Sequence, residues 1–181
     1  MTTPKRSAED VASQLMNECG AGFLGTVSVR SDWPTVSAES PAKDPPVTSA
    51  SLDDVVPYVS LVSVARVGAA SVAMLLSRLA VHTQNLARSS AVSLLLCEST
   101  LSGIDPMSSG RATLIGELQP LSHDEEMNAR EVFLRRHPNS RMVADFSDFA
   151  FYVLRVNVCH VIAGLGRIET VPASRLHGRV G

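Results

Sequence analysis

The amino-acid sequence predicts a single mainly β domain, in which short antiparallel strands form a small barrel with flanking helices. The chain has 181 residues, enough for one domain with a sizeable core, and 45% of them are hydrophobic. Short β-rich runs follow one another with only turns and short helical segments between them. Because parallel strands need longer helical crossovers, this spacing favours antiparallel pairing.

The N-terminal part predicts one helix and one strand. Ser7 and Asp10 have the spacing of a capping box, and apolar residues then recur every four positions. We expect this amphipathic helix to end at Gly20 and Gly22, because glycine commonly terminates helices. An apolar run at 23–30 follows as the first strand.

The segment 31–56 interrupts the pattern of strands. Four prolines lie in it among serine, aspartate and lysine residues, with only isolated apolar positions. A stretch of this length without a strand or helix pattern is unusual inside a compact domain. We therefore expect an atypical surface loop inserted into the barrel.

Five further strands are predicted in the rest of the chain, at 58–66, 71–78, 92–97, 111–118 and 149–163. The first two of them are close in sequence and are expected to pair with each other. A short helical segment occupies 81–87, and a stronger helix runs from a capping box at Ser122 and Glu125 to Pro138. Residues 172–181 are expected to form a C-terminal tail.

Composition excludes several kinds of partner and compartment. The formal net charge is -2, from 16 basic and 18 acidic residues, which gives no reason to expect nucleic acid or an anionic membrane as partner. The three cysteines are scattered without a C-x-x-C pair, which argues against a structural metal or a disulfide framework. No apolar stretch has the length of a membrane span or the form of a signal peptide, so we expect a cytoplasmic protein.

One segment has the chemistry of an anion site. At 75–86 an apolar strand runs directly into a polar helical turn, with Arg78 at the strand end and His82 and Thr83 in the turn. Arginine, hydroxyl groups and unpaired backbone N–H groups at a helix start together can hold a phosphate. The alternative is an ordinary strand followed by a solvated helix start, and spacing alone does not exclude it.

Neighbouring strands offer a groove beside this segment. Ser60 and Ser63 are placed to line it, and Arg111, at the start of another strand, is either a further positive charge or a solvated arginine. Flavin mononucleotide (FMN) suits such a groove, because its ring needs apolar walls and its phosphate needs arginine and hydroxyl donors. His177 lies in a basic tail, where it either ligates haem iron or belongs to a frayed terminus.

The sequence lacks the local signatures of common hydrolases and nucleotide-binding enzymes. It contains no G-x-S-x-G elbow, no P-loop and no H-E-x-x-H motif. The two glycines at 164 and 166 are not followed by the third glycine of a dinucleotide-binding fingerprint. No paired acid, base or nucleophile stands out, and no catalytic residue is predicted.

Several segments resemble the pyridoxamine 5'-phosphate oxidase-like split-barrel superfamily. The runs at 57–63, 75–86 and 92–96 are similar to its flavin-binding half. The runs at 111–116, 133–138, 148–152 and 163–167 are similar to the branch that includes haem-utilisation proteins. Together they cover most of the chain apart from the 31–56 insertion and the extreme tail.

The resemblance implies a six-stranded FMN-binding split barrel that dimerises, with two flavin sites built from both subunits at the dimer interface. The implied function is that of a flavin-dependent oxidoreductase, related to pyridoxamine 5'-phosphate oxidase, that acts on a small-molecule substrate. Carried over by position, the cofactor-binding residues are Ser60, Val62, Ser63, Ser77, Arg78, Leu79, His82, Thr83, Asn85 and Arg111. The flavin supplies the hydride chemistry itself, so the protein needs to bind and orient it.

Two alternatives remain open at the level of sequence. One is a haem-binding or haem-utilisation protein on the same fold, with His177 as iron ligand. The other is a split barrel without cofactor that serves as a binding or regulatory dimer. Three departures from the superfamily pattern bear on this choice: the 31–56 insertion, the Ser89-Ser90 pair where Asp-Pro is common, and Leu165 in place of an aromatic residue.

Overall fold

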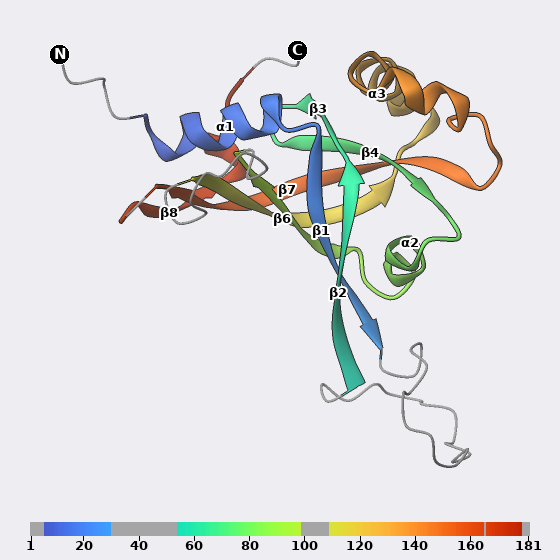
Figure 1. Cartoon of the computed structure of the whole chain (residues 1–181), viewed down its shortest axis with the longest axis horizontal. Helices are drawn as coiled ribbons and strands as arrows, with labels where there is room; N and C mark the ends of the chain where they lie inside the picture. The colour runs from blue at the N-terminus through green and yellow to red at the C-terminus, as the bar shows by residue number, and fades with distance from the viewer. Residues whose placement is uncertain (1–5, 30–53, 99–108, 165, 179–181) are drawn as a thin grey trace.

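The computed structural model describes residues 6–29, 54–98, 109–164 and 166–178. In this part of the chain the strands form one sheet in the order β2-β1-β5-β6-β7-β4-β3, with β8 added on β7, and every pairing is antiparallel (Figure 1). The strands are β1 (Ala21–Val29), β2 (Val55–Ser63), β3 (Ala65–Gly68), β4 (Ser71–Ser77), β5 (Ala91–Cys97), β6 (Gly110–Pro120), β7 (Phe149–Ala163) and β8 (Ile168–Pro172). The predicted mainly β, antiparallel fold is confirmed.

Three α-helices flank the sheet: α1 (Ala8–Glu18), α2 (Val81–Leu86) and α3 (His123–Arg136). The capping boxes predicted at Ser7 and Ser122 are both present. Two short 3-10 helices occupy Pro138–Met142 and Ala173–Arg175. Among the described residues, no helix is long and apolar enough to cross a membrane.

The hydrophobic core has two parts. In the larger one, α1 buries Leu15 and Met16 against the inward residues of the sheet, such as Leu94 and Leu114. In the smaller one, Phe133 of α3 is fully buried beside Phe151 of β7, with the ring centroids 5.6 Å apart in an edge-to-face arrangement. The two helices therefore cover different parts of the sheet.

The predicted strand at 58–66 is in fact two strands that pair with different partners. Val64 lies between them: its N–H donates to the carbonyl of Gly20 at 2.9 Å, and its carbonyl accepts from Nε2 of His137 at 2.9 Å. Because both backbone groups bond outside the ladder, the strand ends at Ser63 and begins again at Ala65. The expected pairing with 71–78 was wrong for most of this run: β2 pairs with β1, and only β3 pairs with β4.

The C-terminal region is more ordered than a free tail. Sequence analysis placed a tail at 172–181 and did not predict β8, which pairs with β7 at 168–172. Val171 is fully buried and Leu176 is 4% exposed. The expectation of a frayed terminus around His177 was therefore wrong, because burial of these two side chains fixes the chain as far as the described residues extend.

Gly116 is required by the close approach of β6 to β7, and its replacement by alanine should be strongly destabilising. The register shifts between Ile115 and Gly116, and a Cβ at Gly116 would lie 2.0 Å from the carbonyl oxygen of Arg155. A backbone atom cannot rotate away, so we expect Gly116→Ala to lower the free energy of unfolding by about 3 kcal/mol in chemical denaturation. Gly20→Ala is the control, because its Cβ would meet nothing closer than 3.4 Å. Equal losses in the two variants would contradict the steric argument.

Candidate functional site

The predicted anion segment borders a cavity of about 310 Å³. The cavity lies where β4 ends, and its lining combines residues from β2, β4, the turn into α2, α3 and the start of β7. The lining residues are Leu61, Val62, Ser63, Leu75, Leu76, Ser77, Ala80, His82, Phe133, Ser140, Val143 and Phe149. Four predicted cofactor-binding residues, Val62, Ser63, Ser77 and His82, are thus brought to one mainly apolar cavity.

Three predicted site residues carry buried polar atoms without a partner. These atoms are Ser60 Oγ, His82 Nε2 and Thr83 Oγ1, and no other buried side-chain nitrogen or oxygen of the described residues lacks a hydrogen bond. Such unpaired groups are uncommon and cost free energy in a folded protein. A ligand that supplied hydrogen-bonding partners would remove that cost, and a phosphate or a flavin ring edge has suitable acceptors.

Arg78 and Leu79 occupy the turn between β4 and α2. The backbone N–H of Arg78 donates to the carbonyl of Asp148 at 2.6 Å, and Arg78 is an exposed residue. Leu79 is 74% exposed. Because α2 has only six residues, its dipole is small, and a phosphate here would depend on the side chains of Arg78, His82 and Thr83.

A carboxylate stands beside the site. Ser77 Oγ donates to Oδ2 of Asp148 at 3.3 Å, a contact that arises because Ser77 pairs with Phe149 across β4 and β7. No pattern in the sequence indicated this contact. A carboxylate repels a phosphate, so an anion bound at Ser77 needs the opposite charge of Arg78 close by.

Burial disfavours the charged form of His82. Burial lowers the pKa of His82 below its usual value of 6.5, because the charged imidazolium would lose hydration. Protonation of His82 therefore destabilises the folded chain relative to the unfolded chain as the pH falls below about 6.5. A bound phosphate would act in the opposite direction and favour the protonated imidazole, which links ligand binding to uptake of a proton.

Six of the ten predicted cofactor residues do not line the cavity, and for two of them, Asn85 and Arg111, the contacts place the residue elsewhere. Asn85 is 1% exposed and donates through Nδ2 to Thr26 Oγ1 at 2.9 Å, which fastens α2 to β1. Arg111 begins β6 opposite Ile162, near the far end of β7 from Phe149. Within one subunit Arg111 therefore does not approach the Ser77 turn, and a cofactor contact from it requires a second subunit.

One wall of the cavity was not indicated by the sequence. Phe133, Ser140, Val143 and Phe149 come from α3, the 3-10 helix after it and β7. Phe133 lies in the helix predicted between Ser122 and Pro138, and no site role was predicted for it. No local pattern at 138–143 distinguishes a cavity wall from a surface turn, because these residues acquire their role by packing.

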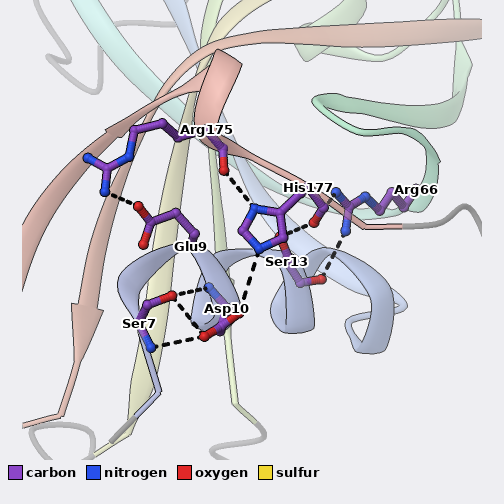
Figure 2. A network of polar contacts seen from close by, with 7 residues as sticks. All are labelled: Ser7, Glu9, Asp10, Ser13, Arg66, Arg175 and His177. Carbon is purple, nitrogen blue, oxygen red and sulfur yellow. Dashed lines mark hydrogen bonds and ion pairs between the residues drawn. The ribbon is translucent and has the colours of Figure 1, made fainter.

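His177 lies against α1 rather than at the cavity. Figure 2 shows its ring between the carbonyl of Arg175, 2.9 Å from Nδ1, and the carboxylate of Asp10, 3.7 Å from Nε2. Its backbone carbonyl accepts from Ser13 Oγ. Nδ1 is thus bonded to the backbone, while Nε2 lies beyond hydrogen-bonding distance of Asp10 on a side chain that is 67% exposed.

The fold and the cavity define a split β-barrel protein, and comparisons with known proteins specify the family. Residues 3–177 match the family model described as CREG, beta-barrel. The chain belongs to this family. The predicted relationship to the pyridoxamine 5'-phosphate oxidase-like split barrels is confirmed. No curated protein matches the sequence at a significant level.

Solved structures with the same fold include haem-related and flavin-related proteins. A heme binding protein from Mycobacterium smegmatis superposes with a TM-score of 0.74 at 22% identity, over 96% of this chain and 61% of that one. A putative pyridoxamine 5'-phosphate oxidase from Listeria innocua gives 0.57 at 11% identity, over 87% and 100% of the two chains. An FAD-binding protein from Mesorhizobium loti gives 0.54 at 14% identity, over 85% and 92%. At these identities the likeness concerns the fold, and this chain spans less than two thirds of the Mycobacterium protein.

Proposed function

We propose that this protein binds FMN at the cavity beside β4 and α2 and acts as a flavin-dependent oxidoreductase on a small-molecule substrate. The observation that carries the proposal is that Val62, Ser63, Ser77 and His82, all assigned to the flavin by resemblance, line one cavity in which His82 Nε2 is buried without a partner. Structural relatives described as an FAD-binding protein and a putative pyridoxamine 5'-phosphate oxidase support a flavin.

In this proposal the chain binds and orients the cofactor. Arg78, His82 and Thr83 hold the phosphate, and Ser60, Val62 and Ser63 lie along the ring. A bound flavin supplies hydride transfer, which requires no acid or base from the protein. The apolar wall that includes Phe133 and Phe149 excludes water from the ring. The three free cysteines suit the reducing cytoplasm in which we place the protein.

We further propose a homodimer, because one face of the sheet exposes apolar side chains. Phe23 of β1 pairs with Leu61 of β2, and Gly25 pairs with Val59, so these side chains point to the same side of the ladder. The exposed large apolar residues on this face are Phe23, Val27, Val55, Val59, Leu61 and Ile115. A contiguous patch of this kind marks an interface, and a second copy would also bring another Arg111 toward a shared site.

Haem binding is the second candidate function. It is favoured by the Mycobacterium relative, whose description is a heme binding protein. His177 would ligate iron through Nε2, at a place apart from the cavity beside β4 and α2, because it is not among the residues that line that cavity. A split barrel without a cofactor is the third possibility.

The absorption spectrum of the protein, purified without added ligand and then titrated with FMN or haemin, tests the proposal. We expect flavin bands at about 370 and 450 nm, with one FMN bound per subunit. A Soret band at about 400 nm, with no response to FMN, would favour haem instead. A colourless protein that responds to neither titration would contradict both cofactor functions.

A further inference from the structure

The residue Asp148 lies where the end of β4 meets the start of β7. Ser77, the last residue of β4, pairs with Phe149, the first residue of β7, and both line the cavity of about 310 Å³. Asp148 directly precedes Phe149 in the chain. The antiparallel register therefore places Asp148 at the same end of β4 as the turn that leads into α2.

Asp148 is bonded to this turn through its backbone and through its side chain. Its carbonyl accepts from the N–H of Arg78 at 2.6 Å, and its Oδ2 accepts from Ser77 Oγ at 3.3 Å. Ser77 Oγ in turn accepts from the N–H of Leu79 at 3.2 Å, and the N–H of Ala80 donates to the Ser77 carbonyl at 3.2 Å. The turn between β4 and α2 thus directs three backbone N–H groups and the Ser77 hydroxyl at protein acceptors.

The Ser77 hydroxyl is the group that a phosphate and Asp148 would both use. A hydroxyl has a single proton to donate, and in this arrangement it is directed at the carboxylate. A separation of 3.3 Å is long for a hydrogen bond between two oxygens, so the bond is weak and a phosphate oxygen can replace the carboxylate as acceptor. The negative charge of Asp148 stays beside the hydroxyl after such an exchange and repels the phosphate.

The positive charge available at this turn is small. Arg78 and His82 are the basic residues in the segment 77–83, and burial lowers the pKa of His82 and so disfavours its charged form. The ion pairs of the described residues include none that neutralises Asp148. The charge of Arg78 is therefore opposed by the charge of Asp148 at the position where the phosphate would bind.

We propose that Asp148 is a built-in competitor of the cofactor phosphate, which accepts the Ser77 proton in place of the phosphate and lowers the affinity of the site for FMN. This inference rests on the proposed function, because the group with which Asp148 competes is the phosphate of FMN. Its consequence is a flavin that is held weakly enough to exchange with solution. Asp148 thereby sets how strongly the site distinguishes FMN from riboflavin, which has the same ring and lacks the phosphate.

Asp148→Asn tests the competition, because it removes the charge and keeps both the backbone carbonyl and a side-chain oxygen that can accept from Ser77. The dissociation constants of FMN and riboflavin are measured by quenching of flavin fluorescence. FMN should bind the variant roughly tenfold more tightly, or better, than it binds the unaltered protein. Riboflavin should bind both proteins with the same affinity within about a factor of two. A merely structural role of Asp148 would instead weaken the binding of FMN, or change the binding of both flavins equally.

Asp124→Asn is the matched control, since it makes the same chemical change at an exposed residue in the first turn of α3. The next residue, Glu125, forms an ion pair with Arg155, which lies opposite Ser71 at the far end of β4 from the cavity. The affinity of this variant for FMN should stay within about a factor of two of the unaltered protein, because a distant exposed charge is screened by salt.

Asp148→Ala provides a second variant in case the first does not fold, and thermal midpoints measured without flavin show which variants are folded. It removes the charge and the side-chain acceptor and keeps the backbone carbonyl, so it should also tighten FMN binding. If the unaltered protein binds FMN and neither folded variant binds it more tightly, the competition is overturned and the flavin site stands. Equal gains for FMN and riboflavin would also overturn the competition. If neither the unaltered protein nor the Asp148 variants bind FMN, the proposed flavin function and the competition both fail.

Discussion

Replacing Arg78 with alanine is expected to weaken FMN binding by roughly 10- to 150-fold, equivalent to the loss of about 1.5–3 kcal/mol from a charge-assisted hydrogen bond. Arg78 lies at the end of β4, next to Ser77, whose hydroxyl contacts Asp148. Without the arginine, a phosphate at this turn would lose its cationic partner and keep the repulsion of the carboxylate. Quenching of flavin fluorescence during titration measures the dissociation constant.

The control for this prediction is Arg135→Ala, which removes the same charge from an exposed residue of α3. It should leave FMN affinity within about a factor of two of the unaltered protein, because a distant exposed charge is screened by salt. Equal affinity for FMN in the unaltered and Arg78→Ala proteins would refute a phosphate contact by Arg78. Equal losses in both variants would indicate a general effect of net charge.

Local signals account for the elements that the sequence predicted well. The helix α1 begins at the capping box of Ser7 and Asp10, and β7 has the bounds expected from its long apolar run, Phe149–Ala163. Such signals depend on residues within a few positions of one another. By contrast, the break at Val64 depends on Gly20 and His137, which are distant in sequence.

The strand β8 shows a different limit. Only Val171 is buried among its five residues, so no alternation of buried and exposed positions is visible. Apart from the burial of Val171, it is held by pairing with β7. A short strand at an edge of the sheet therefore lacks the periodic pattern by which strands are recognised in a sequence.

The candidate site residues were also predictable only where they lie close together in the sequence. The proposed phosphate side of the cavity beside β4 lies in one continuous segment, from Ser77 to Thr83, whose residue types predicted an anion site. The Asp148 contact and the Phe133 wall come from other elements and had no local signal. Arg66 of β3 and Arg135 of α3 likewise line a second cavity only because packing brings them together.

Replacing Leu61 with aspartate is expected to dissociate the proposed homodimer. Leu61 is 66% exposed in the single subunit and lies beside Phe23 on the apolar face. The monomer can accept a carboxylate there, but burying it in an interface without a partner should cost about 3 kcal/mol or more, a weakening of at least roughly 100-fold. In a twofold interface both subunits carry the substitution, so the free-energy cost of burying the carboxylate arises once in each subunit. Sedimentation velocity across a concentration series measures the change in the monomer–dimer equilibrium.

Loss of the dimer should also reduce FMN binding, because the proposed site requires a second subunit to bring Arg111 near. Leu61 itself lines the cavity, so FMN affinity is also measured on Val59→Asp, which changes the same apolar face at a residue that is 62% exposed and outside the cavity lining. Met127→Asp is the matched control: Met127 is 72% exposed on α3, outside the apolar face, and its variant should remain dimeric with full FMN affinity. If Leu61→Asp were monomeric yet bound FMN with unchanged affinity, one subunit alone would suffice for the site. If the unaltered protein were monomeric at micromolar concentration, the apolar face would need another partner.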